Sequence, residues 1–220
     1  SDWLINYQGV LVRRGLIGEI LFKLHKLTLV DLDILIFLFV ISLYAIFSFN
    51  LLKSIKYIEN SNINILIFLS PAFFIYPIMN SGVVGRKDIL LLALVSSFVF
   101  LDKKINQKFH FPILILSTLF LSLSHSGFAF YIPYFIFLYL LTKNNRDLKI
   151  TFQDVIIPVL FLVALILFIK SLNGNEYQIN QICDSVKEFV AADCTKSGQI
   201  FHLGSGVEYR FAEKFKMGEG

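Results

Sequence analysis

The sequence is poor in charge, and it lacks the residue groupings on which most soluble enzymes depend. Charged residues make up 16% of the 220 positions, whereas a soluble domain carries roughly 25%. We find no metal-ligand spacing of His, Cys and carboxylates, no nucleotide-binding loop and no persuasive Ser-His-Asp order. Lys and Arg form no block interleaved with aromatic residues. We therefore expect no metal, no other cofactor and no nucleic-acid partner.

Cysteine is nearly absent as well. The two cysteines, Cys183 and Cys194, both lie in the polar C-terminal part of the chain, close enough in sequence to pair across a short loop. Disulfides persist outside the cytoplasm, and one closing so small a ring contributes ~3 kcal/mol. The spacing is not that of a zinc motif. We predict a disulfide in an extracytoplasmic tail, with two free structural thiols as the alternative.

Long apolar runs are abundant. Hydrophobic residues reach 56% and Phe alone occurs 24 times. Runs of this length are typical of membrane-spanning helices, and they cover 32–52, 63–79, 89–101, 112–141 and 155–172. The fourth run is too long for one crossing and is broken by Ser124 to Gly127, which predicts a hairpin of two short helices. We expect an all-α polytopic membrane protein with about six membrane helices.

Basic residues predict the orientation of these helices. Short cytoplasmic loops are enriched in Lys and Arg, and three alternating loops carry the basic residues Lys53, Lys56, Lys103, Lys104, Lys108, Lys143, Arg146 and Lys149. The opposite, extracytoplasmic face receives an N-terminal loop (1–31) and a C-terminal loop or tail (173–220), with the transmembrane domain (32–172) between them. The start without Met and the polar end indicate a fragment of a longer protein.

The N-terminal loop contains a predicted interfacial helix from about residue 14 to residue 27. Its apolar residues fall on one face, and Glu19, Lys23 and Lys26 fall on the other, with Glu19 and Lys23 one helical turn apart. If the helix extends back to Arg13, that side chain lies in the apolar stripe and must pair, reach water or bind an anion. Nonspecific binding of lipid phosphates by Arg13 and Arg14 is the alternative.

Two further polar clusters fall on the same predicted face. Arg86, Lys87 and Asp88 precede an apolar helix, whose free N–H groups favour a phosphate; alternatively, Asp88 is simply its N-cap. His125 lies in the hairpin turn, where polar groups are costly and often functional. A turn histidine bonded to backbone or water is the alternative. The remaining histidines, predicted to be solvated, are His25, His110 and His202.

Together these residues favour a lipid diphosphate substrate. When a sugar is transferred from a polyprenyl diphosphate, negative charge builds on the leaving diphosphate, and fixed guanidinium groups stabilise it. The predicted substrate-binding residues are Arg13, Arg14, Arg86, Lys87 and Asp88. The acceptor hydroxyl needs a base, for which Asp2 and Glu19 are the nearest candidates on this face, and His125 is a third catalytic candidate.

The chain also resembles a family. Its Arg13-Arg14-Gly15, Gly85-Arg86-Lys87-Asp88 and Ser124-His125 segments look like bacterial O-antigen or capsule repeat-unit polymerases (Wzy-like), and distantly like GT-C membrane glycosyltransferases. The resemblance implies a multi-pass protein of the bacterial inner membrane whose periplasmic arginines contact a polyprenyl-diphosphate-linked glycan. Membrane lipids and other polysaccharide assembly proteins are the implied partners. Ser126 stands where related proteins often have Glu, which weakens an acid role at this turn.

Three other functions remain open. A transporter or flippase for the same lipid should carry polar or charged residues deep within several spans, whereas charge here gathers at one interface. A noncatalytic subunit of a polysaccharide assembly complex should tolerate every arginine substitution. An acyltransferase acting through His125 lacks an acidic partner downstream, because Asp147 lies on the opposite predicted face.

Overall fold

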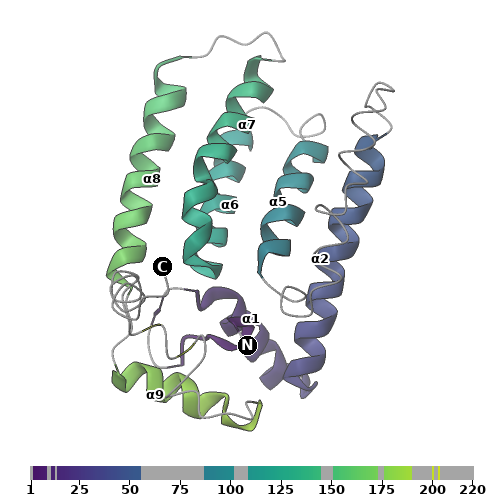
Figure 1. The fold of residues 1–220 in the computed structure, drawn as a ribbon, viewed down its shortest axis with the longest axis vertical. Helices are drawn as coiled ribbons and strands as arrows, with labels where there is room; N and C mark the ends of the chain where they lie inside the picture. The colour runs from purple at the N-terminus through teal and green to yellow at the C-terminus, as the bar shows by residue number, and fades with distance from the viewer. Residues whose placement is uncertain are drawn as a thin grey trace, which may run out of the picture. The chain divides into compact units, whose positions relative to one another are not determined.

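The computed structural model describes residues 2–8, 11–12, 14–55, 87–101, 109–144, 151–172, 176–189, 200 and 203. Within these ranges every regular element is a helix, which confirms the all-α prediction for this part of the chain (Figure 1). The helices are η1 (Asp2–Leu4), α1 (Leu16–Thr28), α2 (Leu32–Ile55), α5 (Asp88–Leu101), α6 (His110–Ser124), η3 (Ser126–Tyr131), α7 (Ile132–Asn144), α8 (Gln153–Ser171), α9 (Glu176–Ser185) and η4 (Lys187–Phe189).

Two helices of the described chain, α2 over Leu32–Lys53 and α8 over Gln153–Ser171, are long and apolar enough to cross a membrane. Shorter apolar helices cover Asp88–Leu101, His110–Ser124 and Ser126–Leu141. The predicted span at 63–79 lies outside the described residues. The total of about six membrane helices therefore stays a prediction.

The predicted break in the long apolar run is confirmed. Helix α6 ends at Ser124, His125 adopts an extended backbone (φ −155°, ψ 117°), and the chain continues as η3 and then α7. The His125 side chain caps η3, because its Nδ1 atom accepts the Gly127 N–H at 3.2 Å. A polar side chain thus satisfies a backbone donor at the point where one helix stops and the next begins.

The chain divides into two compact units. Unit 1 comprises Ser1–Ile36 and Leu114–Gly220, and unit 2 comprises Phe37–Ile113. In unit 1, side chains of η3, α7 and α8 form a buried apolar cluster of Ala129, Ile132, Ile136, Leu165 and Ile169. This cluster holds η3 against both helices, and so fixes the start of α7 beside the end of α8.

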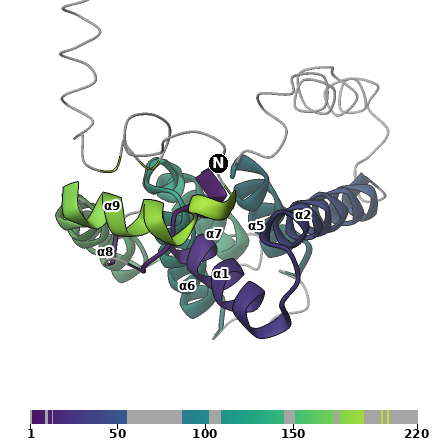
Figure 2. The same ribbon diagram turned by 90° about the horizontal axis from the view of Figure 1, so that it is seen from below.

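Residues 2–8 pack directly on α1 in unit 1. Trp3 and Ile5 are buried, and a Cβ atom at Gly18 would overlap the carbonyl oxygen of Ile5 and lie 2.8 Å from that of Trp3. Only glycine allows the segment to approach α1 so closely. The Asn6 amide donates to Ser185 Oγ of α9 at 2.9 Å. Figures 1 and 2 show α1 and α9 lying across one end of α7 and α8.

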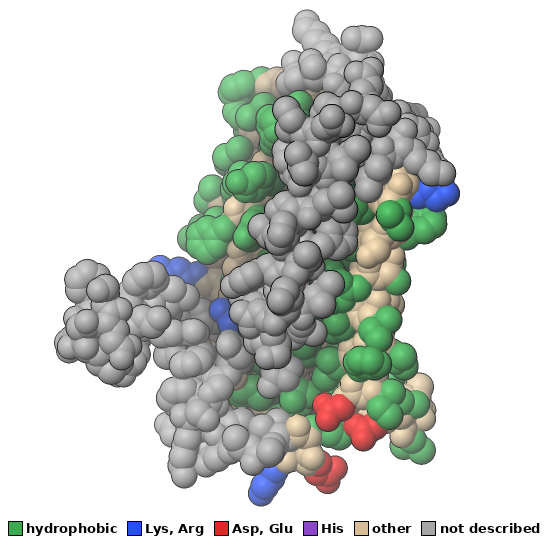
Figure 3. All heavy atoms as spheres, turned by 45° about the vertical axis from the view of Figure 1, so that its right-hand side comes forward, with side chains coloured by type: hydrophobic (Ala, Val, Ile, Leu, Met, Phe, Trp, Pro, Cys, Tyr) green, Lys and Arg blue, Asp and Glu red, His purple; other side chains and the backbone are tan. Residues whose placement is uncertain are grey.

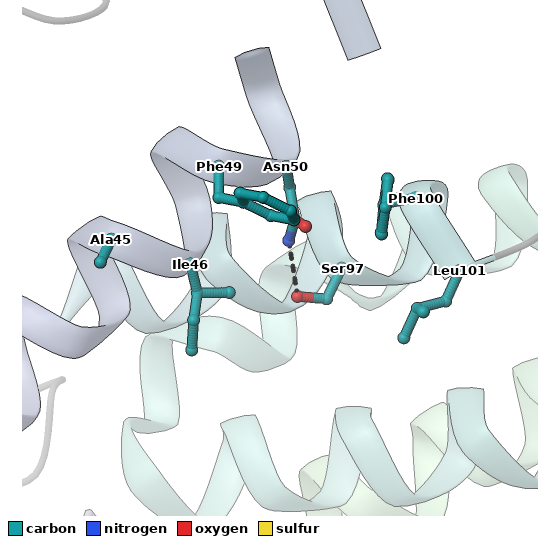
Figure 4. A pocket seen from close by; sticks show the side chains of 7 residues that line it. All are labelled: Ala45, Ile46, Phe49, Asn50, Ser97, Phe100 and Leu101. Atoms are coloured by element: carbon teal, nitrogen blue, oxygen red, sulfur yellow. Dashed lines mark hydrogen bonds between the residues drawn. The ribbon is translucent and has the colours of Figure 1, made fainter. Parts of the chain in front are cut away.

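In unit 2, α2 and α5 share a polar link within an apolar contact. The buried Asn50 amide donates to Ser97 Oγ at 2.9 Å (Figure 4). It also donates to Ser96 Oγ at 3.3 Å. An apolar groove surrounds this link, lined by Ala45, Ile46, Phe49, Asn50, Ser97, Phe100 and Leu101.

His110, predicted to be solvated, is instead buried at 1% exposure, with its ring edge-on to Phe98.

Large apolar side chains remain exposed on the two long helices. Phe37 of α2 is 62% exposed, and Leu160 and Leu167 of α8 are each 63% exposed. On the face drawn in Figure 3, hydrophobic side chains cover much of the described helical surface, and the acidic side chains gather at one end. Contiguous exposed apolar surface of this kind marks contact with a membrane or another protein.

Candidate functional site

Polar side chains from two distant parts of the sequence meet at the start of η3 in unit 1. We call Asp2, Arg14, His125 and Ser126 the His125 cluster. Arg14 Nε donates to Ser126 Oγ at 3.1 Å, and His125 Nε2 lies 3.7 Å from Asp2 Oδ2. The His125 and Asp2 side chains are 27% and 20% exposed. The cluster thus brings together three predicted site residues, partly shielded from solvent but accessible.

Arg14 reaches this cluster through an unusual backbone conformation. Its φ of 73° lies in the left-handed region, which costs a residue with a Cβ atom about 1 kcal/mol. Helix α1 begins only at Leu16, so Arg14 belongs to the turn before the helix, and Arg13 lies outside the described residues. Backbone strain of this kind is often found at functional sites. Here it accompanies the contact of the Arg14 guanidinium with η3.

The hydrogen bonds of His125 define its tautomer. Because Nδ1 accepts the Gly127 N–H, the proton of the neutral ring is on Nε2, the atom that faces Asp2 Oδ2. The ring also lies against Phe128, with 5.0 Å between centroids. His125 is therefore arranged to orient the Asp2 carboxylate rather than to accept a proton itself.

Glu19 has a different environment from the solvated face that the helical pattern predicts. It is 8% exposed, and its carboxylate accepts the Tyr7 N–H at 3.0 Å, the Gln8 amide at 3.2 Å and Lys23 Nζ at 3.3 Å. Burial alone raises the pKa of Glu19, but these three donors together lower the pKa below its ordinary value. The predicted Glu19–Lys23 pair is confirmed, within a contact that anchors residues 7 and 8 to α1.

Tyr7 packs against the turn that carries Arg14. A Cβ atom at Gly15 would overlap the Tyr7 ring, so glycine at this position allows the ring to lie on the turn. Burial, and secondly the nearby Glu19 charge, raise the pKa of the Tyr7 hydroxyl to about 12. Tyr7 therefore stays neutral at physiological pH.

The other predicted substrate-binding residues belong to unit 2 or lie outside the described residues. Arg86 lies outside the described residues. Lys87 and Asp88 belong to unit 2, where Lys87 is 2% exposed and Asp88 is the first residue of α5 rather than the residue before it. A shared anion site for Arg14 and the residues around Asp88 stays a prediction.

In the C-terminal part, Cys183 is buried on α9 and takes part in a disulfide bond. Cys194, the only other cysteine of the chain, lies outside the described residues.

The structure also corrects the prediction for His25, which is not simply solvated. Its Nδ1 lies 2.6 Å from the Val30 carbonyl oxygen, and its ring lies edge-on to Phe189 of η4.

The sequence-based prediction missed a second polar cluster, formed where α7 ends and α8 begins. In this Asp154 cluster the carboxylate accepts Tyr139 OH at 3.0 Å, Lys143 Nζ at 2.5 Å, and both the N–H and the hydroxyl of Thr151 at 2.6 Å. The pattern Thr-Phe-Gln-Asp before an apolar run resembles a helix-capping signature, and that signal could have revealed the role of Asp154.

Among the described residues, no group of three or more His, Cys, Asp or Glu side chains could hold a metal ion. Comparison with protein-family models, with curated proteins and with solved structures finds no match to this chain. The His125 cluster is therefore the candidate functional site.

Proposed function

We propose that this chain is a membrane glycosyltransferase or polysaccharide polymerase that acts on polyprenyl-diphosphate-linked sugars at the extracytoplasmic face of the bacterial inner membrane. The observation that carries this proposal is that Arg14 donates to Ser126, and that His125, the residue before Ser126, faces Asp2 at the turn between α6 and α7. A fixed cation beside a carboxylate–imidazole pair is suited to a reaction in which a diphosphate leaves and a hydroxyl loses its proton.

The exposed apolar surface supports a place in the membrane. Only 22% of the apolar stretch of α2 and 17% of that of α8 are buried, whereas the core helix of a soluble protein is mostly buried. In this proposal the described helices belong to a set of about six membrane helices, with α6 and α7 as the short hairpin and the C-terminal tail outside the cytoplasm.

The exposed side chains of helix α1 support a position for this helix at the boundary between membrane and water. Ile20, Leu24 and Leu27 recur on one face and are 49%, 40% and 83% exposed, while Lys23 and Lys26 flank them. An exposed apolar stripe beside lysines suits the boundary between acyl chains and phosphate headgroups. Helix α1 would thus lie in the membrane plane, with the His125 cluster at the depth of lipid phosphates.

Arg14 would bind the diphosphate of the substrate. A guanidinium presents donors in a fork that matches phosphate oxygens, and it keeps its charge at every physiological pH. The Nε–H bond to Ser126 and the left-handed turn restrict its orientation before substrate arrives. The leaving diphosphate gains negative charge as its bond to the sugar breaks, and the cation stabilises this charge in a water-poor site.

Asp2 is the favoured base, with His125 as its positioning partner. The acceptor oxygen would attack the anomeric carbon while its proton passes to the Asp2 carboxylate, and the bond from that carbon to the diphosphate breaks. The protonated Nε2 of His125 faces this carboxylate and would orient it. Glu19 is the weaker candidate, because three donors already hold its oxygens and lower its pKa.

The test is an analysis of lipid-linked glycans in a strain that lacks the gene, complemented with wild type, with Arg14→Ala or with Lys170→Ala. Lys170 is an exposed cation at the C-terminal end of α8 and serves as the matched control. Arg14→Ala should fail to complement, while Lys170→Ala should complement fully.

The accumulating species identifies the reaction. Accumulation of single repeat units in the Arg14→Ala strain indicates a polymerase, and loss of the repeat unit indicates a single-sugar transferase. Normal glycan in that strain contradicts the proposal. Repeat units trapped on the cytoplasmic face would instead indicate a flippase.

A further inference from the structure

A continuous row of aromatic rings leads from the His125 cluster along η3 into α7. Ring centroids are 5.0 Å apart for His125 and Phe128, 6.5 Å for Phe128 and Tyr131, and 6.1 Å for Tyr131 and Tyr134. The spacing of three residues explains the row, because a 3₁₀-helix has three residues per turn and aligns every third side chain. We call these four residues the ring row.

The ring row passes from the interior to the surface. Phe128 is 2% exposed, Tyr131 is 45% exposed and Tyr134 is 66% exposed. One end of the row is therefore part of the His125 cluster, and the other end is open to a ligand. The outer rings are continuous with the site rather than scattered aromatic residues on a helix surface.

The chemistry of the outer rings differs from that of their exposed neighbours. Phe130 and Phe137, the other highly exposed rings of η3 and α7, are 81% and 58% exposed and have no polar group. The two exposed members of the ring row are both tyrosines, which combine an apolar ring face with a hydroxyl at the edge. Such a surface suits a ligand that also has an apolar face and hydroxyl groups at its edge.

A pyranose ring has these properties, because its C–H groups present an apolar face and its hydroxyls lie around the rim. We propose that Tyr131 and Tyr134 form a carbohydrate-stacking subsite for the glycan of the lipid-linked substrate. This inference rests on the proposed function, because the diphosphate bound at Arg14 would place the attached sugar beside the inner end of the ring row.

The test measures the binding of two probes to the full-length chain in lipid nanodiscs. One probe is undecaprenyl diphosphate that carries a single N-acetylglucosamine, and the other is undecaprenyl diphosphate without a sugar. The variants are Tyr131→Leu and Tyr134→Leu, singly and together, with Tyr131→Phe as the conservative change. Phe137→Leu is the matched control, because it removes an exposed ring of α7 that is outside the ring row. Thermal unfolding confirms that each variant is folded.

The double Leu variant should bind the sugar-bearing probe roughly tenfold more weakly, as expected for lost ring stacking, and should bind the sugar-free probe as wild type does. Phe137→Leu should leave both affinities within about threefold. Tyr131→Phe keeps the ring face and loses the hydroxyl, so it should weaken binding of the sugar-bearing probe by less than the double Leu variant does. Equal losses for the two probes would assign the rings to the isoprenoid chain or the bilayer, as expected for interfacial tyrosines, and would overturn the subsite.

Unchanged binding of both probes by the double Leu variant would also overturn the subsite, while leaving the proposed function intact. If wild type binds neither probe, the proposed function fails and the subsite fails with it. The sugar-free probe therefore separates the two failures.

Discussion

The two polar clusters of unit 1 lie at opposite ends of α7, and they differ in the lengths of their polar contacts. At the Asp154 cluster, three residues converge on one carboxylate at 2.5 to 3.0 Å. At the His125 cluster, Arg14 Nε donates to Ser126 Oγ at 3.1 Å, His125 Nδ1 accepts the Gly127 N–H at 3.2 Å, and His125 Nε2 lies 3.7 Å from Asp2 Oδ2. The first arrangement directs several short hydrogen bonds to one carboxylate, whereas the second has longer contacts between side chains from two distant parts of the sequence.

The clusters also differ in how they are assembled. The partners of Asp154 lie within 15 residues of it in the sequence. Two of them belong to α7, and the third, Thr151, lies just before α8. Arg14 and Ser126 are 112 positions apart, and Arg14 has left-handed backbone geometry. A local, saturated cluster is typical of a structural connection, while a long-range cluster that includes backbone strain is typical of a functional site. Substitutions in the two clusters should therefore have opposite effects on activity and stability.

The largest effect should follow from the loss of the Arg14 guanidinium. Arg14→Ala should lower the turnover rate by roughly 10²- to 10³-fold, as for the loss of one preorganised electrostatic contact. Arg14→Gly should lower activity as much, yet unfold at a temperature no lower than wild type, because glycine adopts a positive φ without steric cost. Rates of glycan transfer and thermal unfolding of the purified variants check both points. Retention of more than a third of the activity in Arg14→Ala would contradict this assignment.

The Asp2–His125 pair should behave as one element. We expect Asp2→Asn and His125→Gln each to lower the turnover rate by roughly 100-fold, in the range for general acid–base groups. Residues that act as a unit give non-additive losses, so the double variant should be little slower than the slower single variant. Turnover rates of the three variants test this prediction, and losses that multiply would show that the two side chains act independently.

The Asp154 cluster should show the reverse behaviour. Its Asp154 and Lys143 side chains are 12% and 15% exposed, and breaking so nearly buried a pair should lower the free energy of unfolding by about 2 kcal/mol in Asp154→Asn. The activity per folded molecule should stay within about twofold of wild type, since the site is at the other end of α7. Chemical or thermal unfolding measures the loss, with the exposed Asp184→Asn as control. Full stability combined with lost activity would reverse the roles of the two clusters.

The smallest effect should come from Glu19. A carboxylate whose pKa is lowered in the folded state adds stability above its unfolded pKa, and this stability is lost as pH falls from that value through the folded pKa. As pH falls from about 4.5, the ordinary value for this group, through the lower folded pKa, residues 7 and 8 should be held less tightly on α1. Hydrogen exchange of the Tyr7 amide measures this change. Glu19→Gln should make the protection factor of that amide, its exchange relative to the unfolded chain at the same pH, nearly independent of pH, and Asp33→Asn should leave the pH dependence as in wild type.

Local hydrophobic patterning was sufficient to predict most of the helices. The runs that form α2 and α8 are apolar over nearly their whole length. The polar residues around His125 predicted a break in the fourth run, and α6 ends at that point. Helix α9 was missed because it is a ten-residue, largely polar segment, too short for its amphipathic pattern to stand out. The burial of His110 was missed because it depends on ring packing with Phe98, which belongs to another helix.

The candidate site was predictable in its residue types but not in its geometry. The distribution of Lys and Arg among the loops predicted that Asp2, Arg14 and His125 lie on the same membrane face. In unit 1, Asp2 lies beside His125, and Arg14 bonds the neighbouring Ser126. The left-handed turn at Arg14 carries no sequence signal, because glycine or asparagine is the usual residue at a positive φ. The burial of Glu19 arises from the close approach of residues 2–8 to Gly18, a tertiary contact that helical periodicity does not contain.

The most direct test of the central claim is photolabelling with a polyprenyl diphosphate that carries a photoreactive group beside the phosphates, followed by mass spectrometry of the labelled peptides. We predict labelling of the peptides that contain Arg14 and His125, and loss of that labelling in Arg14→Ala but not in Lys170→Ala. Labelling confined to the apolar groove between α2 and α5, or labelling of the His125 peptide that persists in Arg14→Ala, would contradict the account.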